Sequence, residues 1–280
     1  MKLFGADFLA AKNNWLYPDT TMQWLIRALI LFVLLFGFYT ILQNVFAGLV
    51  FYFVMKGDAT DLTPGSPGFV QFIRSYMLSI FPAAVVTFLI AIFAVRFGKP
   101  GRAGRLPLGR VKLGLLGWPV VVIGFLIFSF LVFQGVFAVM GVDPSAYAPS
   151  AGGLSDKKSL AGLVEKAMAD MAKDPKLYAL VTLSAVIGAP FVEELLFRGA
   201  LFAAIAQSPV GRWGAVIITA ALFGLVHAMT DGWPVVFSLF LMGITLGVLL
   251  LRFGSIWVTI ACHAAWNGVQ ALALLAIGTS

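Results

Sequence analysis

The fold of this chain is decided by a charged cluster inside a long apolar stretch, PFVEELLFRG at residues 190–199. An ionised group in hydrocarbon is strongly unfavourable, so a helix that only crossed a membrane would not carry two adjacent carboxylates and an arginine. Helical spacing places Glu194 and Arg198 at i and i+4 on one face, whereas Glu193 points about 100° around the axis. We therefore expect one glutamate to be structural and the other to be available for chemistry. A salt bridge where the helix leaves the bilayer is the alternative interpretation.

The overall composition predicts a polytopic membrane protein. Hydrophobic residues make up 61% of the 280 residues, charged residues only 11%, and the mean hydropathy is +0.98. These values lie far outside those of a soluble globular domain. The net charge of +7 comes from lysines and arginines concentrated between apolar runs. We interpret this charge as membrane topology and expect no nucleic-acid partner.

Seven apolar stretches are long enough to predict membrane spans. They predict an all-α transmembrane helical bundle of about seven spans, with a site among the last four. We expect a single membrane domain over residues 1–280, in which residues 1–176 hold the first spans and an extramembrane loop, and residues 177–280 hold the catalytic helices. The predicted spans are 22–55, 75–97, 113–140, 177–207, 213–230, 233–251 and 256–277.

The connections between these spans predict their orientation. Residues 98–112 carry five basic residues and no acidic one, so we expect this connection to be cytoplasmic. The N-terminus would then be cytoplasmic and the C-terminus outside. On the outer side, residues 141–176 show apolar residues at helical spacing, which predicts an amphipathic helix on the membrane or a solvated helix. Short cytoplasmic turns and a compact chain favour a bacterial inner membrane protein.

The chain has two histidines, and both lie in apolar stretches near the C-terminus. A single intramembrane histidine is more often a packing residue, but two histidines and a glutamate favour a site. Glu193 and His227 lie 17 residues before and after the turn near Val210, which puts them at one depth in an antiparallel hairpin. His263 is followed at i+4 by Asn267 on the same helical face.

These side chains favour hydrolysis. A carboxylate beside an imidazole can deprotonate a water, while a second imidazole and an amide can stabilise an oxyanion. Alternatively, Glu193, His227 and His263 match the donor set of a zinc site, in which the metal activates the water. The spacing does not choose between these mechanisms. We favour the one without a required cofactor, because Asn267 is a natural oxyanion donor but a poor zinc ligand.

Three motifs follow one another along the terminal helices: EExxxR at 193–198, FxxxH at 223–227 and HxxxN at 263–267. This ordered set resembles the CPBP family, which comprises CAAX-prenyl endopeptidases and bacteriocin-processing enzymes and is also called the ABI family. The resemblance covers about residue 177 to the C-terminus. It implies an intramembrane endopeptidase, of glutamate or metallo type, that acts on a membrane-associated protein or peptide in the lipid bilayer.

The resemblance also implies a role for each matching residue. Glu193 would be the general base and His227 would position the water with it, while His263 and Asn267 would form the oxyanion hole. Three further residues would support this site, namely Glu194, Arg198 and Phe223.

Two other classes of function remain open on sequence grounds. A proton-coupled transporter could use the intramembrane glutamate and histidines as a relay. A non-catalytic membrane scaffold, such as a bacteriocin-immunity factor, would keep the helices but tolerate the loss of these side chains.

Overall fold

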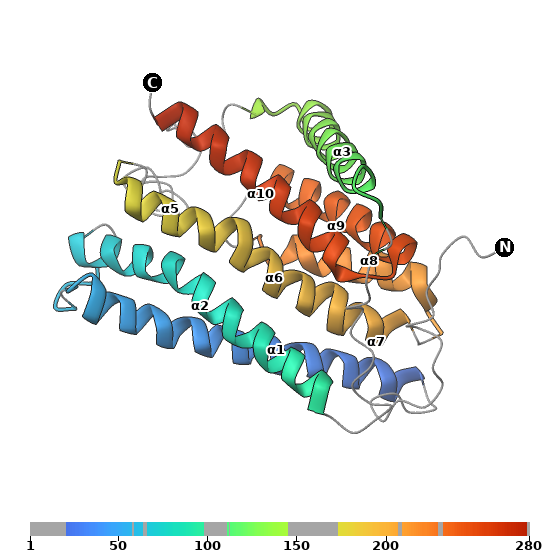
Figure 1. Cartoon of the computed structure of the whole chain (residues 1–280), viewed down its shortest axis with the longest axis horizontal. Helices are drawn as coiled ribbons and strands as arrows, with labels where there is room; N and C mark the ends of the chain where they lie inside the picture. The colour runs from blue at the N-terminus through green and yellow to red at the C-terminus, as the bar shows by residue number, and fades with distance from the viewer. Residues whose placement is uncertain are drawn as a thin grey trace.

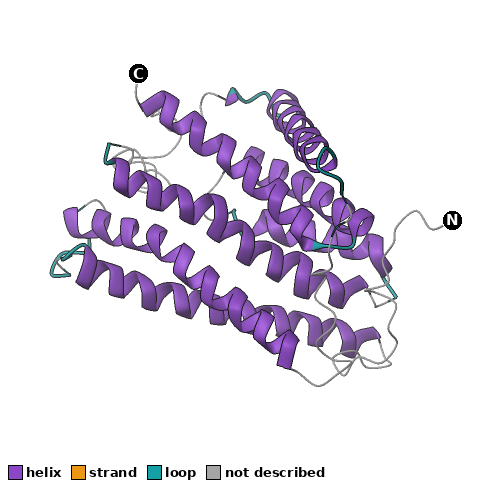
Figure 2. Cartoon of the chain, viewed as in Figure 1, coloured by secondary structure: helices purple, strands orange, loops and turns teal. Residues whose placement is uncertain are grey.

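The computed structural model describes residues 21–57, 59–63, 66–97, 111, 113–144, 173–206, 209–228 and 232–278. Within these ranges every regular element is a helix (Figure 2). Helices satisfy their backbone hydrogen bonds internally, as a chain in hydrocarbon must. The predicted all-α bundle is therefore confirmed.

The helices follow the predicted apolar stretches. The first part of the chain forms α1 (Thr21–Leu49), the π-helix η2 (Val50–Val54), α2 (Pro67–Phe97) and α3 (Gly117–Val139). The second part begins with one continuous helical rod, made of α5 (Pro175–Leu183), η4 (Ser184–Gly188), α6 (Ala189–Glu194), η5 (Leu195–Leu201) and α7 (Phe202–Ala206). It continues with α8 (Gly211–Leu225), α9 (Trp233–Phe253) and α10 (Ile256–Gly278).

The protein is an integral membrane protein. Among the described residues, 5 helical segments are long and apolar enough to cross a membrane, at 32–54, 67–90, 117–139, 175–201 and 233–253. Helix α8 has only 15 residues, which is short of the roughly 20 that a span requires. Its predicted end was Thr230, but the helix stops at Leu225.

The helical rod α5–α7 lies in the middle of the bundle (Figure 1). Helices α1 and α2 pack together on one side of the rod, and α10 lies along the other side. Helices α8 and α9 form a hairpin that packs behind the rod, and α3 contacts α9 and α10 at the edge. The rod can therefore direct side chains to most other helices.

Local sequence explains where the rod begins and where the last two helices separate. Asp174 caps α5, because its Oδ1 accepts from the backbone N–H of Lys176 at 2.9 Å, and Pro175 occupies the first turn. Gly254 ends α9 in the left-handed region with φ 66°, which a glycine adopts without strain. This turn sends α10 back along the bundle after only two residues.

Small residues let α8 and α9 pack closely. A Cβ atom at Gly243 would lie 3.0 Å from the Cα of Ala220, and one at Gly224 would lie 2.8 Å from the carbonyl oxygen of Val236. Such close backbone approach is typical of helix pairs in membranes. There the hydrophobic effect does not drive association, and small residues allow the van der Waals packing that does. Helices α8 and α9 are thus held tightly against each other.

Two predictions concern residues outside the described ranges. Of the basic connection 98–112, only Val111 is described, and the predicted amphipathic helix falls mostly in residues 145–172. The orientation of the chain, with a cytoplasmic N-terminus, stays a prediction.

Candidate active site

The centre of the site is an ion pair between Glu194 and Arg198 that is completely buried. Arg198 Nη1 donates to Glu194 Oε1 at 3.1 Å, and both side chains have 0% exposure. Arg198 Nη2 also donates to the carbonyl oxygen of Gly243 at 3.2 Å, and the guanidinium lies 4.5 Å from the ring centroid of Phe223. Arg198 therefore joins the rod to α9 and α8 as well as neutralising Glu194.

Glu194 holds a histidine as well as the arginine. His263 Nδ1 lies 3.0 Å from Glu194 Oε1. A carboxylate that is paired with an arginine only accepts hydrogen bonds, so Nδ1 of His263 carries the proton that it donates. This contact fixes the imidazole ring and directs its other nitrogen, Nε2, to a position 3.8 Å from Glu193 Oε2.

Glu193 and Glu194 differ sharply in environment although they are adjacent. The side chain of Glu193 is 25% exposed, whereas that of Glu194 is fully buried. Among the described residues, the ion-pair partner of Glu193 is His263, whose Nε2 lies 3.8 Å from Glu193 Oε2. Glu194 is thus held by Arg198 and His263, whereas Glu193 is more accessible; that Glu193 is available for chemistry stays a prediction.

His227 lies beyond the end of its helix. It was expected within a span, but α8 stops at Leu225 and His227 belongs to the turn that follows. Its Nδ1 donates to the carbonyl oxygen of Phe223 at 2.9 Å, which leaves Nε2 as an acceptor. Because the helix has already ended, the imidazole is only partly buried.

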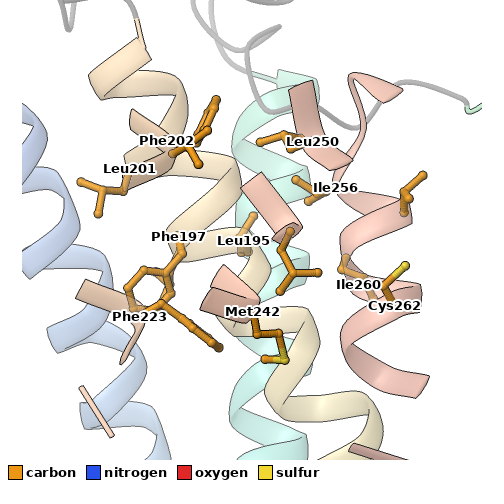
Figure 3. Packing of buried hydrophobic residues seen from close by; sticks show 14 of the residues in the cluster. Leu195, Phe197, Leu201, Phe202, Phe223, Met242, Leu250, Ile256, Ile260 and Cys262 are labelled. Atoms are coloured by element: carbon orange, nitrogen blue, oxygen red, sulfur yellow. The ribbon is translucent and has the colours of Figure 1, made fainter. Parts of the chain in front are cut away.

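Phe223 connects the two histidines. Its ring centroid lies 5.3 Å from the His227 ring and 5.6 Å from the His263 ring. It also packs edge-on against Phe197 of the rod at 5.4 Å, and Figure 3 shows these two side chains next to each other in the core. The fully buried Phe223 therefore sets the separation of the two imidazole rings.

Asn267 lies one turn after His263 on α10 and also faces the rod. Its Nδ2 donates to the carbonyl oxygen of Ala185 at 2.8 Å. The structure thus brings Glu193, Glu194, Arg198 and His263 into one network. It places Asn267 beside this network and links His227 to it through a phenylalanine.

The predicted zinc ligands are Glu193, His227 and His263. Among the described residues, no group of three or more His, Cys, Asp or Glu side chains is arranged to hold a metal ion. These three side chains therefore do not fit a zinc site in the described part of the chain.

Sequence reasoning missed two kinds of participant. The first is Tyr39 of α1, which packs against the core close enough to Glu193 for the two groups to interact electrostatically. Its signal was the inward spacing of Phe32, Leu35 and Tyr39 along α1. The second is the backbone carbonyl of Gly243, and its signal was the GxxxG motif at 243–247, which marks close helix packing.

The fold and the site define an integral membrane protein with a buried network of carboxylates, an arginine and an imidazole, a class that includes membrane enzymes and proton-coupled carriers. Within that class, residues 175–269 match the family described as Type II CAAX prenyl endopeptidase Rce1-like. The match runs from the first residue of α5 to just beyond Asn267 and includes all three motifs. Over this part of the chain, the match agrees with the resemblance of the three motifs to the CPBP family. No curated protein and no solved structure matches the chain.

Proposed function

We propose that this protein is an intramembrane endopeptidase that hydrolyses a peptide bond of a membrane-associated protein or peptide. The observation that carries the proposal is the position of His263 between Glu194 at 3.0 Å and the more accessible Glu193 at 3.8 Å, inside the matched segment. A network that only stabilised the fold would have no use for a second, partly exposed carboxylate.

Glu193 activates the attacking water. Its carboxylate is partly exposed, so a water can approach it, whereas Glu194 Oε1 is already occupied by Arg198 and His263. Glu193 accepts a proton from the water as the water oxygen attacks the peptide carbonyl carbon. His227 assists with Nε2, which can accept the second water proton in a hydrogen bond because Nδ1 is already donating.

His263 and Asn267 stabilise the oxyanion that forms on the carbonyl oxygen. With both ring nitrogens protonated, His263 donates from Nδ1 to Glu194 and from Nε2 to this oxygen, and Asn267 donates an N–H to it, as the tetrahedral intermediate develops. Glu193 then passes its proton to the leaving nitrogen, and the C–N bond breaks to give a carboxylic acid and an amine. Phe223 and the pair of Glu194 and Arg198 keep the two imidazole rings in place.

The test uses the full chain in lipid vesicles with an internally quenched farnesylated peptide that ends in a CAAX sequence, and the same peptide without lipid. Glu193→Gln keeps the size of the side chain but removes the base, so the rate should fall about 10²–10⁴-fold. The control is Asp61→Asn, which alters an exposed carboxylate in the loop before α2 and should leave the rate unchanged. Comparing membrane peptides from cells that produce wild type or Glu193→Gln finds the substrate without assuming a lipid.

Hydrolysis by Glu193→Gln within roughly tenfold of wild type would sink the proposal. Asn267→Ala should lower hydrolysis roughly 100-fold. A proton-coupled transporter would instead show pH-driven flux that survives this substitution. Protein stripped of metal should keep its activity and added zinc should inhibit it. Activity that is lost on chelation and restored by zinc would make this protein a metalloendopeptidase.

A further inference from the structure

The π-helix η4 leaves a backbone carbonyl open in the middle of the rod. The N–H of Ala189 donates to the carbonyl of Ser184, five residues earlier. In this register the next carbonyl, that of Ala185, would accept from residue 190, which is a proline and has no N–H. A carbonyl without a donor is unfavourable in a membrane interior, so it needs a partner from another helix.

That partner is the side chain of Asn267, whose Nδ2 lies 2.8 Å from the Ala185 oxygen. Because a carbonyl oxygen only accepts, this contact decides which end of the carboxamide faces the rod. The NH2 group has two hydrogens, and one of them is committed to Ala185. The other hydrogen is left for a second acceptor.

Neighbouring contacts hold α10 against α5 and η4 near this bond. The hydroxyl of Tyr178 donates to the carbonyl of Ala271, about one turn beyond Asn267. A Cβ atom at Gly268 would lie 3.8 Å from Cγ1 of Val186, which is ordinary van der Waals contact. The position of the carboxamide is thus set by backbone packing as well as by its own hydrogen bond.

The other side of η4 is fixed in a similar way. Pro82 within α2 leaves the carbonyl of Leu78 without its helical donor, and Ser184 Oγ lies 3.5 Å from that oxygen. A Cβ atom at Gly188 would lie 2.9 Å from the Cα of Phe81, so the two backbones are in direct contact. Hence η4 is held between α2 and α10.

We propose that Pro190 is a positioning residue for the oxyanion hole. By supplying no N–H, it keeps the Ala185 carbonyl open, and this carbonyl orients the Asn267 carboxamide so that its second N–H donates to the reacting carbonyl oxygen. The inference rests on the proposed function, because it assigns Pro190 a part in the same reaction. It differs from a packing role, since Pro190 acts only through Asn267.

The test replaces the proline with a residue that has an N–H. Pro190→Ala lets residue 190 compete for the Ala185 carbonyl, which loosens the carboxamide. The value of kcat should fall about 3- to 10-fold, which corresponds to the net free energy of about one hydrogen bond, and KM should not change. In an Asn267→Ala background the same substitution should have no further effect. The matched control is Pro234→Ala, which alters another buried proline in the first turn of α9, where an N–H needs no partner.

Two results would overturn the inference. One is a kcat for Pro190→Ala equal to that of wild type, and the other is additive losses from Pro190→Ala and Asn267→Ala. If Pro190 only packed, its substitution would lower thermal stability, and any loss of kcat would add to the loss caused by Asn267→Ala. Failure of the proposed function looks different, because wild type and Glu193→Gln would then not differ in hydrolysis. In that case the hydrogen bond from Asn267 to Ala185 is tested by thermal unfolding instead. If the bond forms, the shifts in unfolding midpoint caused by Pro190→Ala and Asn267→Ala should not add in the double variant.

Discussion

Helix α1 and the site residues of α6 and α10 satisfy their polar groups in different ways. In α1, polar side chains turn back on their own helix: Thr40 Oγ1 donates to the carbonyl of Phe36 at 2.9 Å, and Asn44 Nδ2 donates to that of Thr40 at 2.8 Å. At the site they cross to other helical segments, as His263 does to Glu194 and Asn267 does to Ala185. In hydrocarbon both solutions satisfy the polar group, but only the second specifies which helices must meet.

Burial follows the same division. In the apolar window of the first span, 32–54, 17% of the residues are buried, and in that of α3 22% are buried. The corresponding share is 44% for α2, 50% for the rod and 50% for α9. Helices α1 and α3 therefore face outward for most of their surface, while α2, the rod and α9 contribute more of the interior. The difference teaches that the site depends on interhelical polar contacts rather than on the number of spans.

The largest effect should come from breaking the buried ion pair. Arg198→Met leaves the Glu194 carboxylate in the core without its cation, which should lower the free energy of unfolding by about 3–5 kcal/mol. The control is Arg252→Met, because Arg252 is exposed at the end of α9 and contacts the ring of Phe253. This control should cost at most about 1 kcal/mol. Denaturant unfolding in detergent measures both, and equal losses would contradict the division.

A smaller effect is expected from adding one methyl group in each region. Gly243→Ala places its Cβ 3.0 Å from Ala220 and 3.3 Å from Arg198 Nη2, so it should destabilise the protein by about 1–3 kcal/mol. Gly124→Ala on α3 meets nothing within 4 Å and should be neutral or stabilising by up to about 1 kcal/mol. Opposite signs in the unfolding midpoints would sharpen the comparison. Destabilisation by Gly124→Ala as large as that by Gly243→Ala would break it.

Hydropathy and helical spacing, which depend only on residues near one another in the sequence, were sufficient to predict the helices and one ion pair. Apolar runs of about span length predicted the bundle, and i,i+4 spacing predicted that Glu194 and Arg198 share a face. They failed at the end of α8, because residues just after Leu225 are still apolar and hydropathy does not distinguish a helix from an apolar turn. The expected inclusion of His227 in a helix was wrong for this reason.

Contacts between distant helices were beyond such rules. The bond from His263 to Glu194 joins residues 69 positions apart, and it depends on how α10 packs against the rod. The bond from Asn267 to Ala185 was harder to predict, because its acceptor is a backbone carbonyl, which every residue has. Only the prolines signalled where such a carbonyl lies open.

The smallest effect concerns a carboxylate outside the membrane, which contrasts with Glu194. Asp61 lies exposed in the loop before α2, where its Oδ1 accepts from Thr63 Oγ1 at 2.6 Å and from the Thr63 N–H at 3.0 Å. These hydrogen bonds to the charged form lower the pKa of Asp61 below its ordinary value. Because the folded pKa is lowered, the loop is stabilised above the ordinary pKa, and this stabilisation is lost as pH falls through the lowered pKa.

Thr63→Val removes the hydroxyl but keeps the N–H, so the pKa of Asp61 should return only part of the way to its ordinary value. Titration of labelled aspartate carboxyls by NMR, with Asp61→Asn for assignment, measures this shift. An ordinary pKa for Asp61 in the wild-type protein would show that this loop does not hold its carboxylate as the core holds Glu194.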